Sequence, residues 1–122
     1  MSDTLANLLL KNLSEVFGER DSKRRMAAID RLYSEDATFF EAERKVWGRE
    51  AIDQAVAALQ ATFPAEFEFA AAAEPARNHD LGRLYWRLGP AGAPAVATGL
   101  DIARFKDGRI HALYVFLNEP PK

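Results

Sequence analysis

The feature that most constrains the fold is a pair of β-rich runs, residues 98–105 and 109–117, joined by Asp107-Gly108. An Asp-Gly pair between two apolar runs is a strong hairpin signal, because glycine adopts a positive φ without steric cost and aspartate tolerates one. The first run also contains Asp101. Because aspartate is depleted in strand interiors, Asp101 is the first candidate functional residue.

Composition limits the classes of protein to consider. The 122 residues, 48% of them hydrophobic, predict one domain spanning 1–122 with a real core. The 18 acidic and 16 basic residues give a net charge of −2, so a nucleic-acid partner is not expected. The chain has no cysteine, and its two histidines lie far apart in the sequence, so we expect neither a disulfide nor a metal site. The leucine-rich run at residues 5–10 is too short for a membrane or signal segment, which makes the cytoplasm the expected location.

Hydrophobic periodicity predicts the order of elements. Apolar residues at helical spacing predict three helices: residues 4–18 with Ser2 or Asp3 as N-cap, residues 21–33, and residues 49–63. Alternation of period two predicts strands at 38–43, 67–73, 81–88, 93–105 and 109–117. Helices followed mainly by antiparallel strands describe an α+β domain, with the helices packed on one face of a curved sheet.

The predicted hairpin has two different faces. Alternation places Gly99, Asp101, Ala103 and Phe105 together on one face of the first strand. The outer face of the last strand is expected to carry Ile110, Ala112, Tyr114 and Phe116, which is more apolar than a solvated sheet face should be. We therefore expect a partner to cover this face, with Arg83, Arg87 and His111 at its rim.

Four segments carry a family resemblance: residues 32–39, 46–52, 82–86 and 99–110. In this order and spacing, the chain resembles the NTF2-like, or SnoaL-like, superfamily over nearly its whole length. The resemblance implies a cystatin-like cone in which three N-terminal helices pack on a strongly curved, mostly antiparallel sheet around an apolar cavity. Its members include ketosteroid isomerases, polyketide cyclases, scytalone dehydratase, limonene epoxide hydrolase and many proteins of unknown function, so the fold alone does not choose an activity.

The resemblance also implies two catalytic positions. An ungapped comparison with ketosteroid isomerases places Glu41 at the general base and Asp101 at the acid of the oxyanion hole. Burial and mutual repulsion of two such carboxyls would raise at least one pKa and leave an acid beside a base. The match fails at the tyrosine of the first helix, whose place falls near Leu13 with Asn12 beside it. Losing that donor argues against steroid isomerase activity.

Other residues are expected at the pocket or the dimer interface on the same grounds. The resemblance implies a homodimer through the outer sheet face with Tyr114 and Phe116. Composition, as argued above, predicts no membrane or nucleic-acid partner. The aromatic residues, and the residues expected to point inward from the last two strands, would line the ligand pocket: Phe39, Trp47, Phe63, Trp86, Ala103, Leu113, Val115 and Leu117.

Two functional interpretations follow. In the first, the protein binds a small, mostly apolar ligand bearing a carbonyl or hydroxyl and carries out acid/base chemistry of isomerase, cyclase, dehydratase or hydrolase type. That chemistry would need no cofactor, with Glu41 as base and Asp101 as acid. In the second, the chain is a non-catalytic ligand-binding or dimerisation module, and Asp101 is a structural acid bonded to the backbone or to a cross-strand partner such as an arginine.

Overall fold

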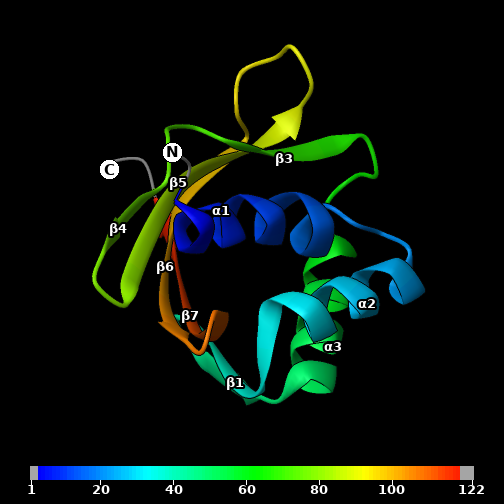
Figure 1. Ribbon diagram of the computed structural model, residues 1–122. Coiled ribbons are helices and arrows are strands. Elements are labelled where there is room, and N and C mark those ends of the chain that lie inside the picture. Colours follow the sequence, from blue (N-terminus) through cyan, green and yellow to red (C-terminus); the bar gives the residue numbers. More distant parts are fainter. Residues whose placement is uncertain (1–2, 119–122) are drawn as a thin grey trace.

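The computed structural model describes residues 3–118. Figure 1 shows a strongly bent sheet with the N-terminal helix lying inside its curve. The predicted first helix has two parts, the α-helix α1 (Thr4–Lys11) and the π-helical segment η1 (Asn12–Phe17). Asp3 caps α1, its carboxylate accepting hydrogen bonds from the backbone N–H groups of Leu5 and Ala6, while the alternative cap Ser2 lies outside the described residues.

The other two helices, α2 (Ser22–Leu32) and α3 (Arg49–Gln60), close one side of the sheet (Figure 1). The buried guanidinium of Arg25 joins them, because its Nε lies 2.6 Å from Asp53 Oδ1 and its Nη1 lies 3.1 Å from Gln60 Oε1. Arg25 also donates to the carbonyl of Glu19, just after η1. This network therefore fixes α2, α3 and the end of η1 relative to one another.

Seven strands form one sheet within residues 3–118. Their spatial order is β2-β1-β7-β6-β5-β3, with β4 paired to β5, and every pair is antiparallel except β1 with β7. The strands are β1 (Tyr33–Glu41), β2 (Arg44–Trp47), β3 (Phe67–Ala71), β4 (Ala76–Asn78), β5 (Leu81–Pro90), β6 (Ala97–Lys106) and β7 (Arg109–Asn118). The predicted α+β cone with a mostly antiparallel sheet is confirmed, whereas β2, β4 and the early start of β1 were not predicted.

The hairpin of β6 and β7 has the predicted turn and one unpredicted bulge. Asp107 and Gly108 have φ values of 52° and 77°, as a type I′ turn requires. Next to the turn, Phe105 pairs with Ile110 but Arg104 pairs with Ala112, so His111 is an extra residue in β7. The prediction that Ile110 faces outward is therefore wrong: the bulge shifts the alternation, and Ile110 is fully buried in the core.

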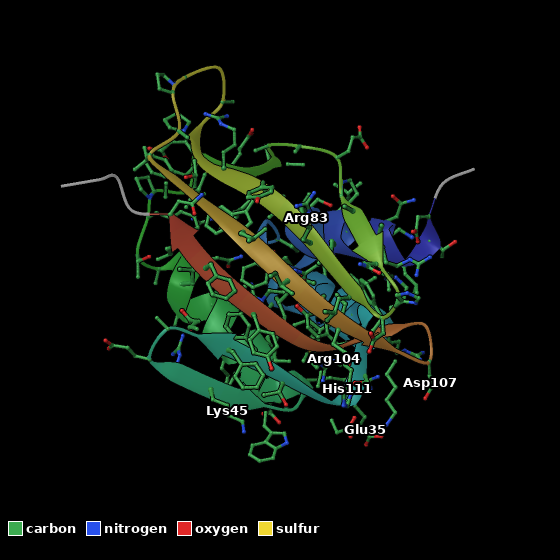
Figure 2. The ribbon with its side chains drawn as sticks, turned by 90° about the vertical axis from the view of Figure 1, so that its left-hand side faces the viewer. Glu35, Lys45, Arg83, Arg104, Asp107 and His111 are labelled. Atoms are coloured by element: carbon green, nitrogen blue, oxygen red, sulfur yellow. The ribbon has the colours of Figure 1, made fainter. Side chains whose placement is uncertain are left out.

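The two sides of the sheet differ in character. The inner face carries the core, which also takes in the buried faces of the helices. Figure 2 shows the outer face, where Lys45, Arg83, Arg104 and His111 come from neighbouring strands. Tyr114 and Phe116 are exposed on β7, as predicted. No helix among residues 3–118 combines the length and apolar character needed to cross a membrane.

Candidate functional site

A cavity of about 350 Å³ opens between η1, the end of α3 and the concave face of the sheet. Its volume is in the range of cavities that bind small molecules. Nearly all of its wall is apolar or aromatic. The lining residues are Leu13, Phe17, Phe39, Glu41, Leu59, Thr62, Phe63, Pro64, Phe67, Phe69, Trp86, Leu88, Val96, Ala97, Asp101, Val115 and Leu117.

Asp101 is the buried acid of this cavity. Its exposed fraction is 3%, and its Oδ1 accepts a hydrogen bond from Trp86 Nε1 at 2.8 Å. Burial raises the pKa of the Asp101 carboxyl to about 7, and the Trp86 hydrogen bond opposes this rise only in part. Among the described residues Oδ2 has no hydrogen-bond partner, so this oxygen is available to a ligand. The partner is a tryptophan on the neighbouring strand β5, so this bond is of the cross-strand kind that a structural role predicts, although the partner is not an arginine.

Gly99 makes the Trp86 hydrogen bond possible. Trp86 pairs with Gly99 across β5 and β6, and its indole ring occupies the space where a Cβ of residue 99 would lie. A Cβ at residue 99 would come within 2.1 Å of Trp86 Cζ2, a distance that no side chain can occupy. The indole therefore crosses β6 at the one residue without a side chain, and its Nε1 reaches Asp101.

Glu41 lines the same cavity but has different surroundings. It lies at the end of β1, and its partly exposed carboxylate accepts a hydrogen bond from Arg44 Nε at 3.0 Å. Arg44 faces Glu41 across the β1–β2 hairpin. Both predicted catalytic carboxyls therefore border one cavity, Asp101 buried in its wall and Glu41 in an ion pair at a more exposed position.

Five of the eight predicted lining residues border the cavity: Phe39, Phe63, Trp86, Val115 and Leu117. The other three do not. Trp47 is 63% exposed and pairs with Thr38 on the outer side of β2, where the Lys45 ammonium lies 5.2 Å from its ring centroid. Ala103 and Leu113 pair with each other and are fully buried in the core. The cavity therefore ends before it reaches this pair.

Two polar residues near the site were not predicted. The Tyr33 hydroxyl donates to Asn12 Oδ1 at 2.5 Å, and both side chains are fully buried. Burial and, to a smaller extent, the charge of Asp101 raise the pKa of Tyr33 well above its usual value. Asn12 Nδ2 is buried without a partner among the described residues. The resemblance placed Asn12 beside the missing tyrosine, but Tyr33 was expected to end a helix, so the bond between the two was not predicted.

Further lining residues had a visible signal in the sequence. Phe67 and Phe69 alternate along β3, and Phe17 ends the apolar stripe of the first helix.

Within residues 3–118, no group of three or more His, Cys, Asp or Glu side chains is arranged to hold a metal ion.

The family model of the SnoaL-like domain matches residues 13–113. The chain belongs to the SnoaL-like family. The matched range includes most of η1, most of the cavity lining and Asp101, and it ends at Leu113 in the last strand. Membership confirms the resemblance seen in the sequence and leaves the activity unassigned, because the family shares a fold rather than one reaction.

Solved structures agree on the fold of this SnoaL-like protein. A candidate isomerase of the SnoaL-like family from Agrobacterium tumefaciens is 23% identical, with a TM-score of 0.85 over 95% of this chain and 98% of that one. A candidate SnoaL-like polyketide cyclase from Jannaschia sp. CCS1 is 13% identical, with a TM-score of 0.76 over 94% of this chain and 85% of that one. An NTF2-like protein of unknown function from Exiguobacterium sp. 255-15 is 24% identical, with a TM-score of 0.70 over 93% and 99%. No curated protein sequence matches the chain significantly.

Proposed function

We propose that this SnoaL-like protein binds a small, mostly apolar ligand in its cavity and exchanges a proton with it through Asp101, without a cofactor. The observation that carries the proposal is a buried carboxyl with a free oxygen on the wall of an apolar cavity. Apolar walls supply binding energy, and a single polar group fixes the orientation of a ligand.

The protonation behaviour of Asp101 suits this role. A general acid or base is most effective when its pKa lies near the working pH, since both protonation states are then populated. With a pKa of about 7, Asp101 holds a proton in part of the molecules at neutral pH and can accept one in the rest. A water-exposed aspartate would be almost wholly ionised there.

Glu41 remains our candidate for the base, with Asp101 as the acid or hydrogen-bond donor. Arg44 fixes the position of the Glu41 carboxylate at the cavity. Geometry precedes pKa in such an assignment, because the base must reach the proton that it removes. A ligand that spans the cavity from Glu41 to Asp101 would meet both groups.

The Glu41–Arg44 ion pair also favours the alternative function, a non-catalytic ligand-binding module. A carboxylate that is already bonded to a guanidinium must give up that bond to act as a base. In this alternative the cavity binds the same kind of ligand, and no bond changes.

Exchange of carbon-bound protons separates these two functions. We would incubate the protein with 2-tetralone, an apolar bicyclic ketone, in deuterated buffer at pH 7 and follow loss of the α-proton signals by NMR. We expect faster exchange than in buffer alone, and loss of that acceleration in Asp101→Asn. As a control, Ala97→Phe places a large side chain in the cavity and should also abolish the effect. Binding of 2-tetralone without exchange would support the non-catalytic module.

We further propose a cytoplasmic homodimer formed through the outer sheet face. On this face the rings of Phe40 and Tyr114 stack at a centroid distance of 4.3 Å, and Phe116 is exposed two residues further along β7. Exposed apolar surface of this kind is typical of an interface. Light scattering should give twice the chain mass of 13.6 kDa, and Phe116→Asp should return it to the monomer value. A monomer mass for the unaltered protein would refute the dimer.

A further inference from the structure

The cavity wall is a continuous cluster of aromatic rings. Five phenylalanines and Trp86 border it, and the centroids of neighbouring rings lie 5.5–6.1 Å apart. Phe69 is central, since its ring centroid lies 5.5 Å from Trp86, 5.7 Å from Phe63 and 6.0 Å from Phe17. Aromatic rings carry partial negative charge on their faces and attract cations that approach them. Such a wall accommodates a positively charged group better than an aliphatic wall does.

The same cluster already binds a cation on its outer side. The guanidinium carbon of Arg20 lies 5.2 Å from the ring centroid of Phe63, and Arg20 Nη2 is held there by the backbone carbonyls of residues 60, 63 and 64. Arg20 itself does not line the cavity. Among residues 3–118, no such cation lines the cavity side of the cluster.

The ionisable groups of the cavity wall are all acidic. Asp101 and Glu41 are the two, and among the described lining residues there is no lysine, arginine or histidine. Glu41 has a partner in Arg44, but the described residues offer Asp101 only the neutral indole N–H on Oδ1. Once ionised, Asp101 is therefore a buried negative charge without a counter-ion, a state that strongly favours binding a cation.

We propose that the ligand of this cavity is a hydrophobic amine, whose ammonium group donates to Asp101 Oδ2 while the aromatic rings enclose its apolar part. The proposal rests on the proposed function only in that the cavity binds a small ligand. What it adds is that the ligand carries a positive charge. Carboxylate ligands would meet two acids and no cation, so the same wall should reject them.

Ion pairing requires a proton balance. Below about pH 7 the Asp101 carboxyl is protonated, so binding of an ammonium ion releases that proton to the solvent as the ion pair forms. The titratable groups near Asp101 are Tyr33, whose hydroxyl donates to Asn12, and Glu41, bonded to Arg44. Neither bond uses Asp101. Amine affinity should therefore increase from pH 5.5 to pH 8, while the affinity for a neutral ligand of the same shape should not.

Calorimetric titration with three indoles tests the proposal. Tryptamine, tryptophol and indole-3-acetate share one ring system and carry a positive, neutral and negative group. At pH 8 we expect tryptamine to bind at least about tenfold more tightly than tryptophol, and indole-3-acetate to bind most weakly. In Asp101→Asn the tenfold preference for the amine should disappear, and Ala97→Phe should abolish binding of all three. Should Asp101→Asn fail to fold, the pH dependence of tryptamine affinity in the unaltered protein replaces it.

The outcomes separate this proposal from the proposed function. Equal affinity for tryptamine and tryptophol, or preference for indole-3-acetate, would overturn the proposal that the ligand is an amine. The proposal that the cavity binds a small ligand would still hold. Tryptamine binding that survives in Ala97→Phe would place the amine outside the cavity and also overturn the proposal. If none of the three indoles binds, the amine proposal is overturned. The 2-tetralone experiment then tests the proposed function independently.

Discussion

The two acidic regions of the cavity differ in what surrounds their carboxylates. Asp101 is buried in β6, and within the part of the chain that the structure describes its one hydrogen-bond donor is an indole N–H. Glu41 lies at the end of β1 in an ion pair with Arg44 and is partly exposed to water. Burial without a counter-ion favours the neutral carboxyl, while pairing with a cation favours the carboxylate. The two carboxyls of this cavity therefore have different environments, because they differ in burial and in the group that bonds to them.

The two carboxyls therefore differ in how much their ionisation costs the folded protein. A buried carboxyl destabilises the folded protein whenever it is ionised, since its charge has lost its hydration. An exposed ion pair contributes little to stability in either direction. The fold therefore bears an energetic cost at Asp101 and almost none at Glu41, and substitutions at the two residues should differ accordingly.

The largest effect is expected for Asp101→Asn. The pKa of Asp101 is raised from 3.8 to about 7 in the folded state, so the folded protein holds a proton that the unfolded chain releases, and stability decreases as pH rises between those values. Asparagine removes this dependence. From pH 5 to pH 8 the free energy of unfolding of the unaltered protein should therefore decrease by roughly 3 kcal/mol relative to that of the variant. Urea unfolding followed by circular dichroism at both pH values measures it.

Asp107→Asn is the matched control for that prediction. Asp107 lies in the exposed hairpin turn with a positive φ, which asparagine also tolerates. The same chemical change there should leave the difference between pH 5 and pH 8 nearly unaltered. An equal response of both variants would show that burial of Asp101 is not the cause.

The next effect is expected for Trp86→Phe. This change removes the N–H that stabilises the Asp101 carboxylate, so the pKa of Asp101 should rise further, by on the order of one unit. Loss of the larger ring should also lower the free energy of unfolding by about 2 kcal/mol. Carbon-13 NMR of the Asp101 carboxyl measures the pKa. Trp47→Phe, which alters an exposed indole on β2, should change neither quantity, and an unchanged pKa in Trp86→Phe would contradict the proposed link.

The smallest effect is expected at the ion pair. Glu41→Gln and Arg44→Gln should each change stability by less than about 1 kcal/mol, as should their coupling in a double-mutant cycle. Neither should move the titration of Asp101. A large shift of the Asp101 titration in Glu41→Gln would mean that the two carboxyls act as one coupled pair, and the contrast between the regions would fail.

The sequence predicted what depends on local pattern. The Asp107-Gly108 turn fixes the register of the β6–β7 hairpin, and alternation from that turn placed Asp101 on the buried face with Gly99 and Ala103. The family resemblance brought Glu41 to the same cavity. These inferences succeeded because a turn type and a period of two extend over neighbouring residues.

The features of the fold and the site that were not predicted depend on contacts that the sequence pattern does not encode. Alternation cannot reveal one extra residue, so the bulge at His111 reversed the predicted side of Ile110. Trp47 was misplaced because the β1–β2 hairpin, which turns it outward, was not predicted. The hydrogen bond from Trp86 to Asp101 is made between side chains of two strands, and the bond from Tyr33 to Asn12 is made between side chains of β1 and η1.

Gly99 has a consequence for reading relatives of this protein. Its missing Cβ lets the indole of Trp86 pass over β6, and that indole supplies the N–H bonded to Asp101. Residues 86, 99 and 101 therefore act as one unit, in which a residue without charge or side chain controls the ionisation of an acid. A SnoaL-like sequence that keeps the aspartate but replaces the glycine or the tryptophan has lost this control, even where an alignment records the acid as retained.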